Sequence, residues 1–128
     1  MKNYNQVYVK NSFEAAKMHC KAFGVEITRS FINEDNTAYD HCELSVAGEG
    51  FLALAEAKNP CDIQNVHKNK WETMTFNVFE MESREAVDNA FRVLSDGGVV
   101  VEPIHELPWS KYFATIIDRF GVCWWISI

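Results

Sequence analysis

The feature that most constrains the fold is a repeat of helix boundaries along the chain. Asn11 and Ser83, both favourable residues at a helix start, lie about 72 residues apart. Gly24 and Gly97, which can each end a helix in the left-handed conformation, are separated by nearly the same distance. Two independent landmarks at one offset indicate an internal duplication. We therefore expect two halves that share one design.

Each half contains one helical pattern and several β-rich segments. In the first half, a strand is predicted before Asn11 and three more after Gly24. The second half repeats this order around Ser83 and Gly97. Both halves therefore read β-α-β-β-β. The predicted strands are residues 4–9, 25–32, 38–46 and 51–57, then 71–79, 99–101, 112–117 and 122–128.

The chain has 128 residues, a length typical of one domain. We expect a single domain over 1–128, with module one at about 1–58, a polar connector at about 59–70 and module two at about 71–128. The fold class is α+β. Two paired β-α-β-β-β modules are expected to form a curled mixed sheet around a concave pocket, lined by residues that face away from the helices.

Periodicity also predicts which side chains are buried. In the second helix the apolar stripe comprises Val87, Ala90, Phe91 and Leu94. His19 interrupts the apolar pattern of the first helix and is expected at the surface or an edge. The first helix's stripe is predicted to be Phe13, Ala16, Cys20 and Phe23, with Asn11 as side-chain cap and Glu14 completing a capping box.

The composition excludes several functions. The formal net charge is −6 and no run of Lys or Arg occurs, which argues against a nucleic-acid partner. No segment approaches the roughly 20 apolar residues needed to span a bilayer, so no membrane partner is expected. The four cysteines lie far apart, without a CxxC pair, and are interpreted as reduced thiols in a cytoplasmic protein.

The sequence resembles the vicinal-oxygen-chelate superfamily of glyoxalase I, bleomycin-resistance proteins and extradiol dioxygenases. Within this superfamily it resembles the PhnB-like branch. The resemblance implies paired β-α-β-β-β modules. It is carried by the segment Asn11 to Gly24, the strand His41 to Val46, the segment Gly97 to Val100, and the tail from Pro103 to Trp124, which contains Asp118-Arg119-Phe120-Gly121.

Metal-dependent members of the superfamily place one ligand, usually His, Gln or Glu, on each of four strands. The resemblance puts these four positions on Tyr4, Leu54, Thr73 or Thr75, and Trp125. Such a set would not hold a divalent ion, which needs imidazole, carboxylate or thiolate ligands. We therefore expect no metal and no other cofactor.

Aromatic residues at these positions suggest binding rather than metal chemistry. Trp124 and Trp125 should lie on opposite faces of one strand, with Trp124 in the core and Trp125 toward the pocket. His41 has two interpretations, a pocket residue or a structural hydrogen-bonding group, and Cys123 is interpreted as a buried thiol. The predicted pocket residues are Tyr4, Gln6, Tyr8, His41, Leu54, Glu56, Thr73, Thr75, Asn77, Glu106, Trp109, Cys123 and Trp125.

The favoured function is metal-free binding of a small planar or apolar molecule in an aromatic-lined pocket, by a homodimer. The first alternative is a metal-dependent lyase or dioxygenase whose ligands have moved to His41, Glu43 or Glu56. The second is an interaction module with a filled cavity. The sequence leaves open whether the protein is an enzyme, and it does not identify the ligand.

Overall fold

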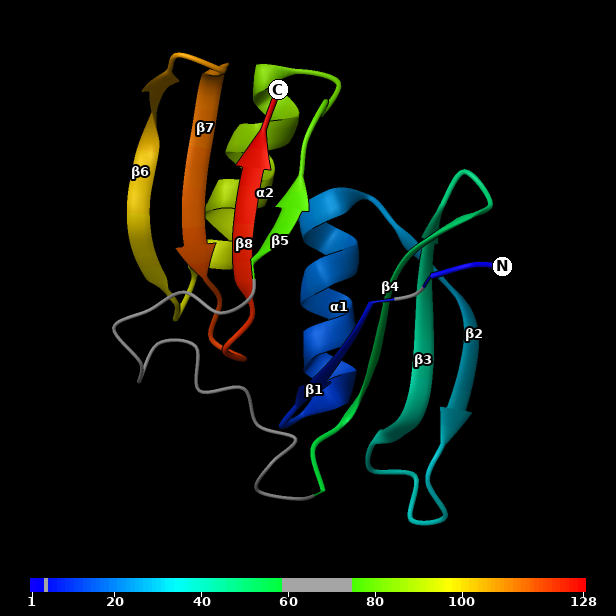
Figure 1. Ribbon diagram of the computed structural model, residues 1–128. Helices are drawn as coiled ribbons and strands as arrows, with labels where there is room; N and C mark the ends of the chain where they lie inside the picture. The colour runs from blue at the N-terminus through cyan, green and yellow to red at the C-terminus, as the bar shows by residue number, and fades with distance from the viewer. Residues whose placement is uncertain (4, 59–74) are drawn as a thin grey trace. The chain divides into compact units, whose positions relative to one another are not determined.

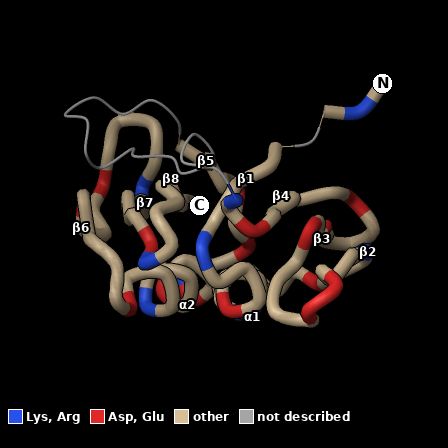
Figure 2. Tube along the Cα trace, turned by 90° about the horizontal axis from the view of Figure 1, so that it is seen from below, with Lys and Arg blue, Asp and Glu red and all other residues tan. Residues whose placement is uncertain are grey.

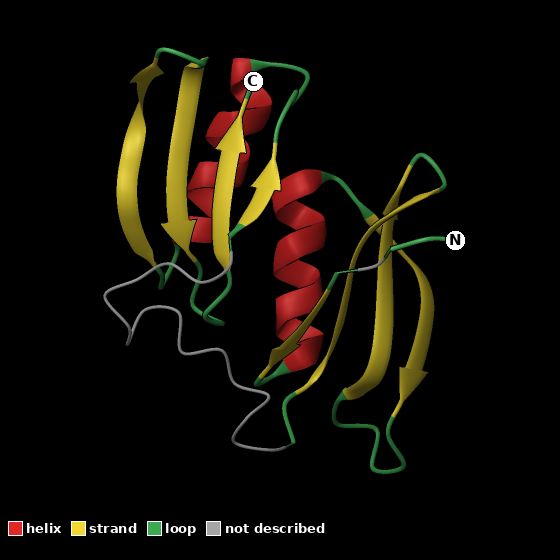
Figure 3. Ribbon diagram, viewed as in Figure 1, coloured by secondary structure: helices red, strands yellow, loops and turns green. Residues whose placement is uncertain are grey.

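The computed structural model describes residues 1–3, 5–58 and 75–128, and the chain divides into two units, Met1–Gln64 and Asn65–Ile128. Each unit contains one helix and one four-stranded mixed sheet (Figures 1 and 3). The predicted order β-α-β-β-β is confirmed in both. The connector predicted at 59–70 lies outside the described residues.

The first unit has the strand order β1-β4-β3-β2, in which β1 runs parallel to β4 and the other neighbours are antiparallel. Helix α1 lies against this sheet (Figure 1). The edge strand β2 is exposed along its whole length. The elements are β1 (Gln6–Val9), α1 (Ser12–Phe23), β2 (Glu26–Ile32), β3 (Tyr39–Val46) and β4 (Glu49–Glu56).

The second unit repeats this topology with the order β5-β8-β7-β6 and a parallel pair formed by β5 and β8. Helix α2 packs on β7 and β8. The elements are β5 (Phe76–Val78), α2 (Arg84–Ser95), β6 (Val99–Leu107), β7 (Ser110–Ile117) and β8 (Cys123–Ser127).

The start of α1 differs from the prediction. Asn11 precedes the helix in the left-handed conformation, with φ 62°, and its side chain forms no cap hydrogen bond. The carboxylate of Glu56, at the end of β4, accepts hydrogen bonds from the backbone N–H groups of Asn11 (3.0 Å) and Ser12 (2.8 Å) instead. Glu14 pairs with Lys17 and makes no capping box. A residue distant in sequence therefore caps this helix.

Two further helix boundaries follow the prediction, whereas α2 ends at Ser95 with an extended Asp96 as C-cap, and Gly97 follows with φ 73°. Gly24 ends α1 with φ 65° and donates its N–H to the carbonyl of Cys20 at 2.8 Å. The side chain of Ser83 caps α2 by accepting from Ala86 N at 3.1 Å. Beyond α2, Gly98 lies so close to the carbonyl oxygen of Ile117 that a Cβ would approach it to 2.4 Å.

The predicted buried stripe of α1 was partly wrong. Phe13, Cys20 and Phe23 are only half-buried, whereas His19, expected at the surface, is fully buried. In α2, Phe91 is half-buried and the other three predicted residues are buried. The residues of α1 that are buried are Ser12, Ala15, Ala16, Met18, His19 and Ala22.

Strands β4 and β6 differ from their predicted bounds of 51–57 and 99–101. The hairpin between β3 and β4 turns at Ala47 and Gly48, both with positive φ, so that Glu49 and Gly50 already belong to β4. Pro103 lies within β6, an edge strand of its sheet, where the missing N–H of proline is tolerated. Strand β6 therefore continues to Leu107.

Charged residues are mixed in both units. Figure 2 shows Lys and Arg interspersed with Asp and Glu along the trace, consistent with the net charge of −6. In the part of the chain that the structure describes, no helix is long and apolar enough to cross a membrane.

Candidate functional site

The sheet of the second unit has a helix face and an opposite face, which we call the distal face. Tyr112 on β7 marks the helix face, because its hydroxyl donates to Asp88 Oδ1 of α2 at 2.5 Å and its ring lies under Arg84. This hydrogen bond raises the pKa of Tyr112. By alternation, Ile116 and its partner Trp124 face α2, while Thr115 and its partner Trp125 lie on the distal face.

Trp124 and Trp125 thus lie on opposite faces, as predicted. Trp124 is 1% exposed and donates its indole N–H to Asp118 Oδ2 at 2.8 Å. The other carboxylate oxygen of Asp118 accepts from the backbone N–H groups of Phe120 (2.9 Å) and Val122 (3.1 Å). A single buried carboxylate therefore holds both the β7–β8 turn and the core tryptophan.

Three rings form a continuous series on the distal face of the second unit. The His105 and Phe113 centroids lie 5.0 Å apart at 70°, and those of Phe113 and Trp125 lie 5.1 Å apart at 86°. Edge-to-face contacts of this kind contribute about 0.5–1.5 kcal/mol each beyond the burial of area. We call His105, Phe113 and Trp125 the aromatic row. It crosses β6, β7 and β8, so three strands fix its geometry.

The indole N–H of Trp125 is buried and, among the described residues, has no hydrogen-bond partner. The register places Asn77 of β5 and Thr115 of β7 on either side of it. A buried donor without an acceptor costs about 1–3 kcal/mol. The aromatic row therefore ends in an N–H group that can bind an acceptor.

At the other end of the row, polar contacts fix the ring of His105. The carbonyl oxygen of Pro103 accepts a hydrogen bond from His105 Nδ1 at 2.6 Å, so Nδ1 carries a proton. Nε2 lies 3.4 Å from Glu102 Oε2. The row thus extends from a polar end, at Glu102 and His105, to the Trp125 indole.

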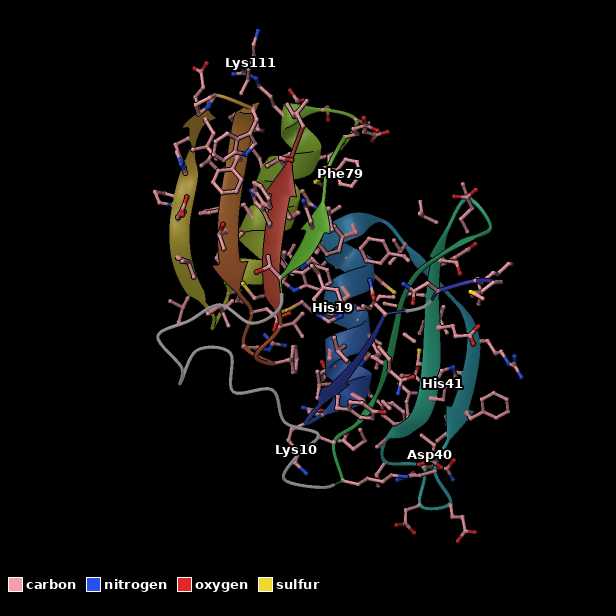
Figure 4. The ribbon with its side chains drawn as sticks, viewed as in Figure 1. Lys10, His19, Asp40, His41, Phe79 and Lys111 are labelled. Carbon is pink, nitrogen blue, oxygen red and sulfur yellow. The ribbon has the colours of Figure 1, made fainter. Side chains whose placement is uncertain are left out.

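The distal face of the first unit carries a different group of residues. His41 Nε2 lies 3.0 Å from Glu43 Oε1, on the same strand. Arg29 and Phe31 of β2 pair in register with Glu43 and His41, and the Arg29 guanidinium lies 5.1 Å from the centroid of the Phe31 ring. Figure 4 shows His41 on β3 beside β2. His41 thus makes the hydrogen bond that was one of its two predicted roles.

Two predicted pocket residues of the first unit do not lie on its distal face. Leu54 is fully buried, paired with Val7 and Cys42, and Glu56 shares its parity and caps α1. Both therefore face the helix. The residues of β4 that share a face with Gln6 and Tyr8 are Ala53 and Ala55. The prediction was one residue out of register, and such a shift moves every side chain to the other face.

The remaining predicted pocket residues are scattered. In the first unit, Gln6 is half-buried and Tyr8 is 39% exposed, both on the distal face. Glu106 is exposed near the end of β6, and Trp109 is 69% exposed in the following turn. His105 and Glu106 both belong to β6, which extends beyond the strand predicted at 99–101.

Three further predicted residues lie on β5, on β8 or directly before β5. Thr75 is half-buried, Asn77 is exposed and Cys123 is 2% exposed. The hydroxyl of Thr75 lies 3.6 Å from Cys123 Sγ. Asn77 is the register neighbour of Trp125. Tyr4 and Thr73 lie outside the described residues.

The described residues do not fit the metal site of the metal-dependent superfamily members. Of the positions at which the resemblance places ligands, Leu54 is a buried hydrocarbon and Trp125 is an indole. Within the described ranges, no group of three or more His, Cys, Asp or Glu side chains could hold a metal ion. The displaced set also fails, because His41 and Glu43 lie on the distal face and Glu56 faces α1.

Comparison with solved structures identifies the fold. Over 99% of this chain and 98% of its own, a PhnB protein from Bacillus cereus matches with 20% identity and a TM-score of 0.76. Protein PA1353 from Pseudomonas aeruginosa matches over 99% and 96%, with 17% identity and a TM-score of 0.77. A glyoxylase/bleomycin resistance protein/dioxygenase domain from Frankia sp. EAN1pec matches over 100% and 96%, with 12% identity and a TM-score of 0.71.

These matches confirm the predicted α+β fold of two β-α-β-β-β modules. The chain has a glyoxalase-like fold, as the sequence resemblance implied. No protein-family model and no curated protein matches the sequence. The likeness therefore defines the architecture, and the function must be argued from the residues of this chain.

Sequence reasoning missed part of the aromatic row. Neither Phe113 nor His105 was among the predicted pocket residues. The signal that could have found Phe113 is the alternation along β7, which puts it on the face of Thr115 and hence of Trp125. The position of His105 opposite Phe113 depends on the bulged register between β6 and β7, and the sequence does not reveal where bulges occur.

Proposed function

We propose that this chain binds a small planar molecule against the aromatic row of the second unit, and that it does so without a metal ion. The observation that carries the proposal is the edge-to-face series from His105 through Phe113 to Trp125. Rings held in fixed orientations offer a planar ligand a contact surface at little cost in conformational entropy.

The polar groups around the row support specific binding. Trp125 contributes an N–H group that has no partner in the described part of the chain, and Asn77 and Thr115 are its register neighbours. Ligand sites are commonly apolar and aromatic surfaces with a few polar groups that fix orientation. The row, with Trp125 at one end and His105 at the other, has this composition.

The proposal is tested with a thermal-shift screen of planar aromatic compounds. We expect wild-type protein to be stabilised by at least one compound, because a ligand that binds only the folded state raises the unfolding temperature. Trp125→Ala should lose this response. Phe79→Ala is the matched control, since Phe79 is 64% exposed, follows β5 and is not part of the row (Figure 4).

Two results would contradict the proposal. One is a screen without any response in the wild type. The other is an unchanged response in Trp125→Ala, which would place binding elsewhere. Trp125→Phe is included because it retains a ring at this position, so a loss of folding in the alanine variant does not end the test.

The alternative, a metal-dependent lyase or dioxygenase, is distinguished by elemental analysis and native mass spectrometry of protein purified without a chelator. We expect no stoichiometric zinc, nickel, iron or manganese, because the described donors do not converge. A bound metal that is lost on His41→Ala or Glu43→Gln would favour the alternative.

Native mass spectrometry also tests the proposed homodimer. The edge strand β2 exposes Ile27, Phe31 and Ile32 at 41%, 51% and 49%. Exposed apolar side chains on an edge strand are typical of surfaces that associate. We therefore expect a mass of twice 14.7 kDa at micromolar concentration.

A further inference from the structure

We infer that Trp125 selects its ligand through a hydrogen bond, and that the ligand is a planar molecule with a neutral carbonyl group. This inference rests on the proposed function and specifies its ligand class. The acceptor would be the carbonyl oxygen of the ligand, and the donor the indole N–H of Trp125.

The neighbouring tryptophan shows what Trp125 lacks. Both indoles belong to β8 and both have a buried N–H group. Trp124 donates its N–H to Asp118 Oδ2 at 2.8 Å, whereas the N–H of Trp125 has no partner within the described residues. Buried indole N–H groups in proteins usually find a partner. The N–H of Trp125 is therefore a donor to which the described residues offer no acceptor.

The polar register neighbours of Trp125 do not accept its indole N–H. Thr115 lies directly across from Trp125 on β7, is 7% exposed and has a hydroxyl that could accept. Asn77 lies across from it on β5 with an amide oxygen. Neither accepts the indole N–H. Among the described residues, the indole N–H thus has no acceptor, although two potential acceptors are its register neighbours.

The charges near the row favour a neutral acceptor. The Glu102 carboxylate lies 3.4 Å from the His105 ring and adds negative charge at that end of the row. A ligand carboxylate would be repelled by it, whereas a ketone, lactone or amide carbonyl would not. Lys111 shares the parity of Phe113 but is exposed near the start of β7, and Figure 4 shows it pointing away from the strands.

The planarity of the ligand follows from Phe113 and Trp125. Their rings meet at 86°, so an edge of one ring meets the face of the other. A flat molecule can stack on one ring while its carbonyl oxygen, in the plane of its own rings, reaches the N–H group. The geometry thus combines stacking with one directional hydrogen bond.

Coumarin and naphthalene form a matched pair of probes. Both are neutral molecules of two fused six-membered rings, and only coumarin has a carbonyl oxygen. We expect wild-type protein to bind coumarin about tenfold more tightly than naphthalene, a ratio that corresponds to one net hydrogen bond. Trp125→Phe, which keeps a ring and removes the N–H, should abolish this preference and leave naphthalene binding within about twofold.

A second measurement requires no variant to bind ligand. In a ¹H–¹⁵N spectrum of the wild type, the indole signal of Trp125 should move on addition of coumarin, and that of Trp124 should stay. Naphthalene should leave the N–H of Trp125 without a hydrogen-bond shift. Signals are assigned by their loss in Trp125→Phe and Trp124→Phe.

The outcomes separate the two proposals. Equal affinity for both probes in wild type and in Trp125→Phe would overturn the hydrogen-bond inference and leave planar binding in place. If neither probe binds up to its solubility limit, while other planar compounds stabilise the protein through Trp125, the carbonyl class is wrong. If no planar compound binds, both the inference and the proposed function fail.

Discussion

The carboxylate of Glu56 accepts a hydrogen bond from the backbone N–H of Ser12 at 2.8 Å and thereby caps a helix that begins 44 residues earlier in the chain. Its second oxygen accepts from Asn11 N at 3.0 Å. A negative group at this position also interacts favourably with the helix dipole. The last residue of β4 is thus bonded to the first turn of α1.

This bond predicts the effect of Glu56→Ala. The variant leaves two N–H groups at the start of α1 without their acceptor, and we expect a loss of about 1–2 kcal/mol in the free energy of unfolding. Urea denaturation followed by far-UV circular dichroism measures it. Glu49→Ala, at the exposed start of the same strand, is the control and should change stability by less than about 0.5 kcal/mol. Equal effects of the two variants would refute the role of Glu56.

In the second unit, the carboxylate of Asp118 accepts several hydrogen bonds, as that of Glu56 does in the first unit. We expect Asp118→Asn to destabilise the protein by about 2 kcal/mol, because the amide has only one oxygen for three donors from Phe120, Val122 and Trp124. A double-mutant cycle with Trp124→Phe isolates the indole bond in urea denaturation. Additive effects of the two substitutions would show that this bond contributes no stability.

Gly98 predicts a packing effect. A Cβ at this position would lie 2.4 Å from the carbonyl oxygen of Ile117 and 2.9 Å from that of Leu94, so the backbone must shift to admit it. We expect Gly98→Ala to cost about 1–3 kcal/mol in thermal or urea unfolding. Ser95→Ala, at the half-exposed end of α2, is the control. A Gly98→Ala variant as stable as wild type would show that the backbone around residue 98 can shift without a cost in stability.

Stability is expected to fall at alkaline pH because burial raises the pKa of the Cys42 thiol to about 11, with Cys20 and Glu43 adding to the shift. The pKa values of Cys20 and Tyr39 are also raised by burial. The folded state therefore holds more protons than the unfolded state above pH 9, and its stability decreases as pH rises toward 11.

The fall attributable to Cys42 is about 2 kcal/mol between pH 9 and 11. Urea denaturation at several pH values measures it, and Cys42→Ala should make the decrease shallower. The same burial predicts slow alkylation of Cys42 by iodoacetamide at pH 8 in the folded protein and rapid alkylation in urea. Labelling at the unfolded rate without urea would contradict this prediction.

The alternation along β8 determined that Trp124 and Trp125 lie on opposite faces, because side chains of a strand alternate whatever surrounds it. The local signals at Ser83 and Gly24 likewise determined the beginning of α2 and the end of α1, since these caps depend on a few neighbouring residues. The β-α-β-β-β order in both halves followed from such local rules.

Other features were decided by tertiary structure. Asn11 looked like a cap, but Glu56 provides the acceptor because β1 and β4 pair in parallel and bring the end of β4 to the start of α1. The register of β4 decided that Leu54 faces the core and Ala53 the distal face. The bulged pairing of β6 with β7 brought His105 to Phe113. Pairing between distant strands set these positions, and a one-residue shift reverses a face without changing the local pattern of the sequence.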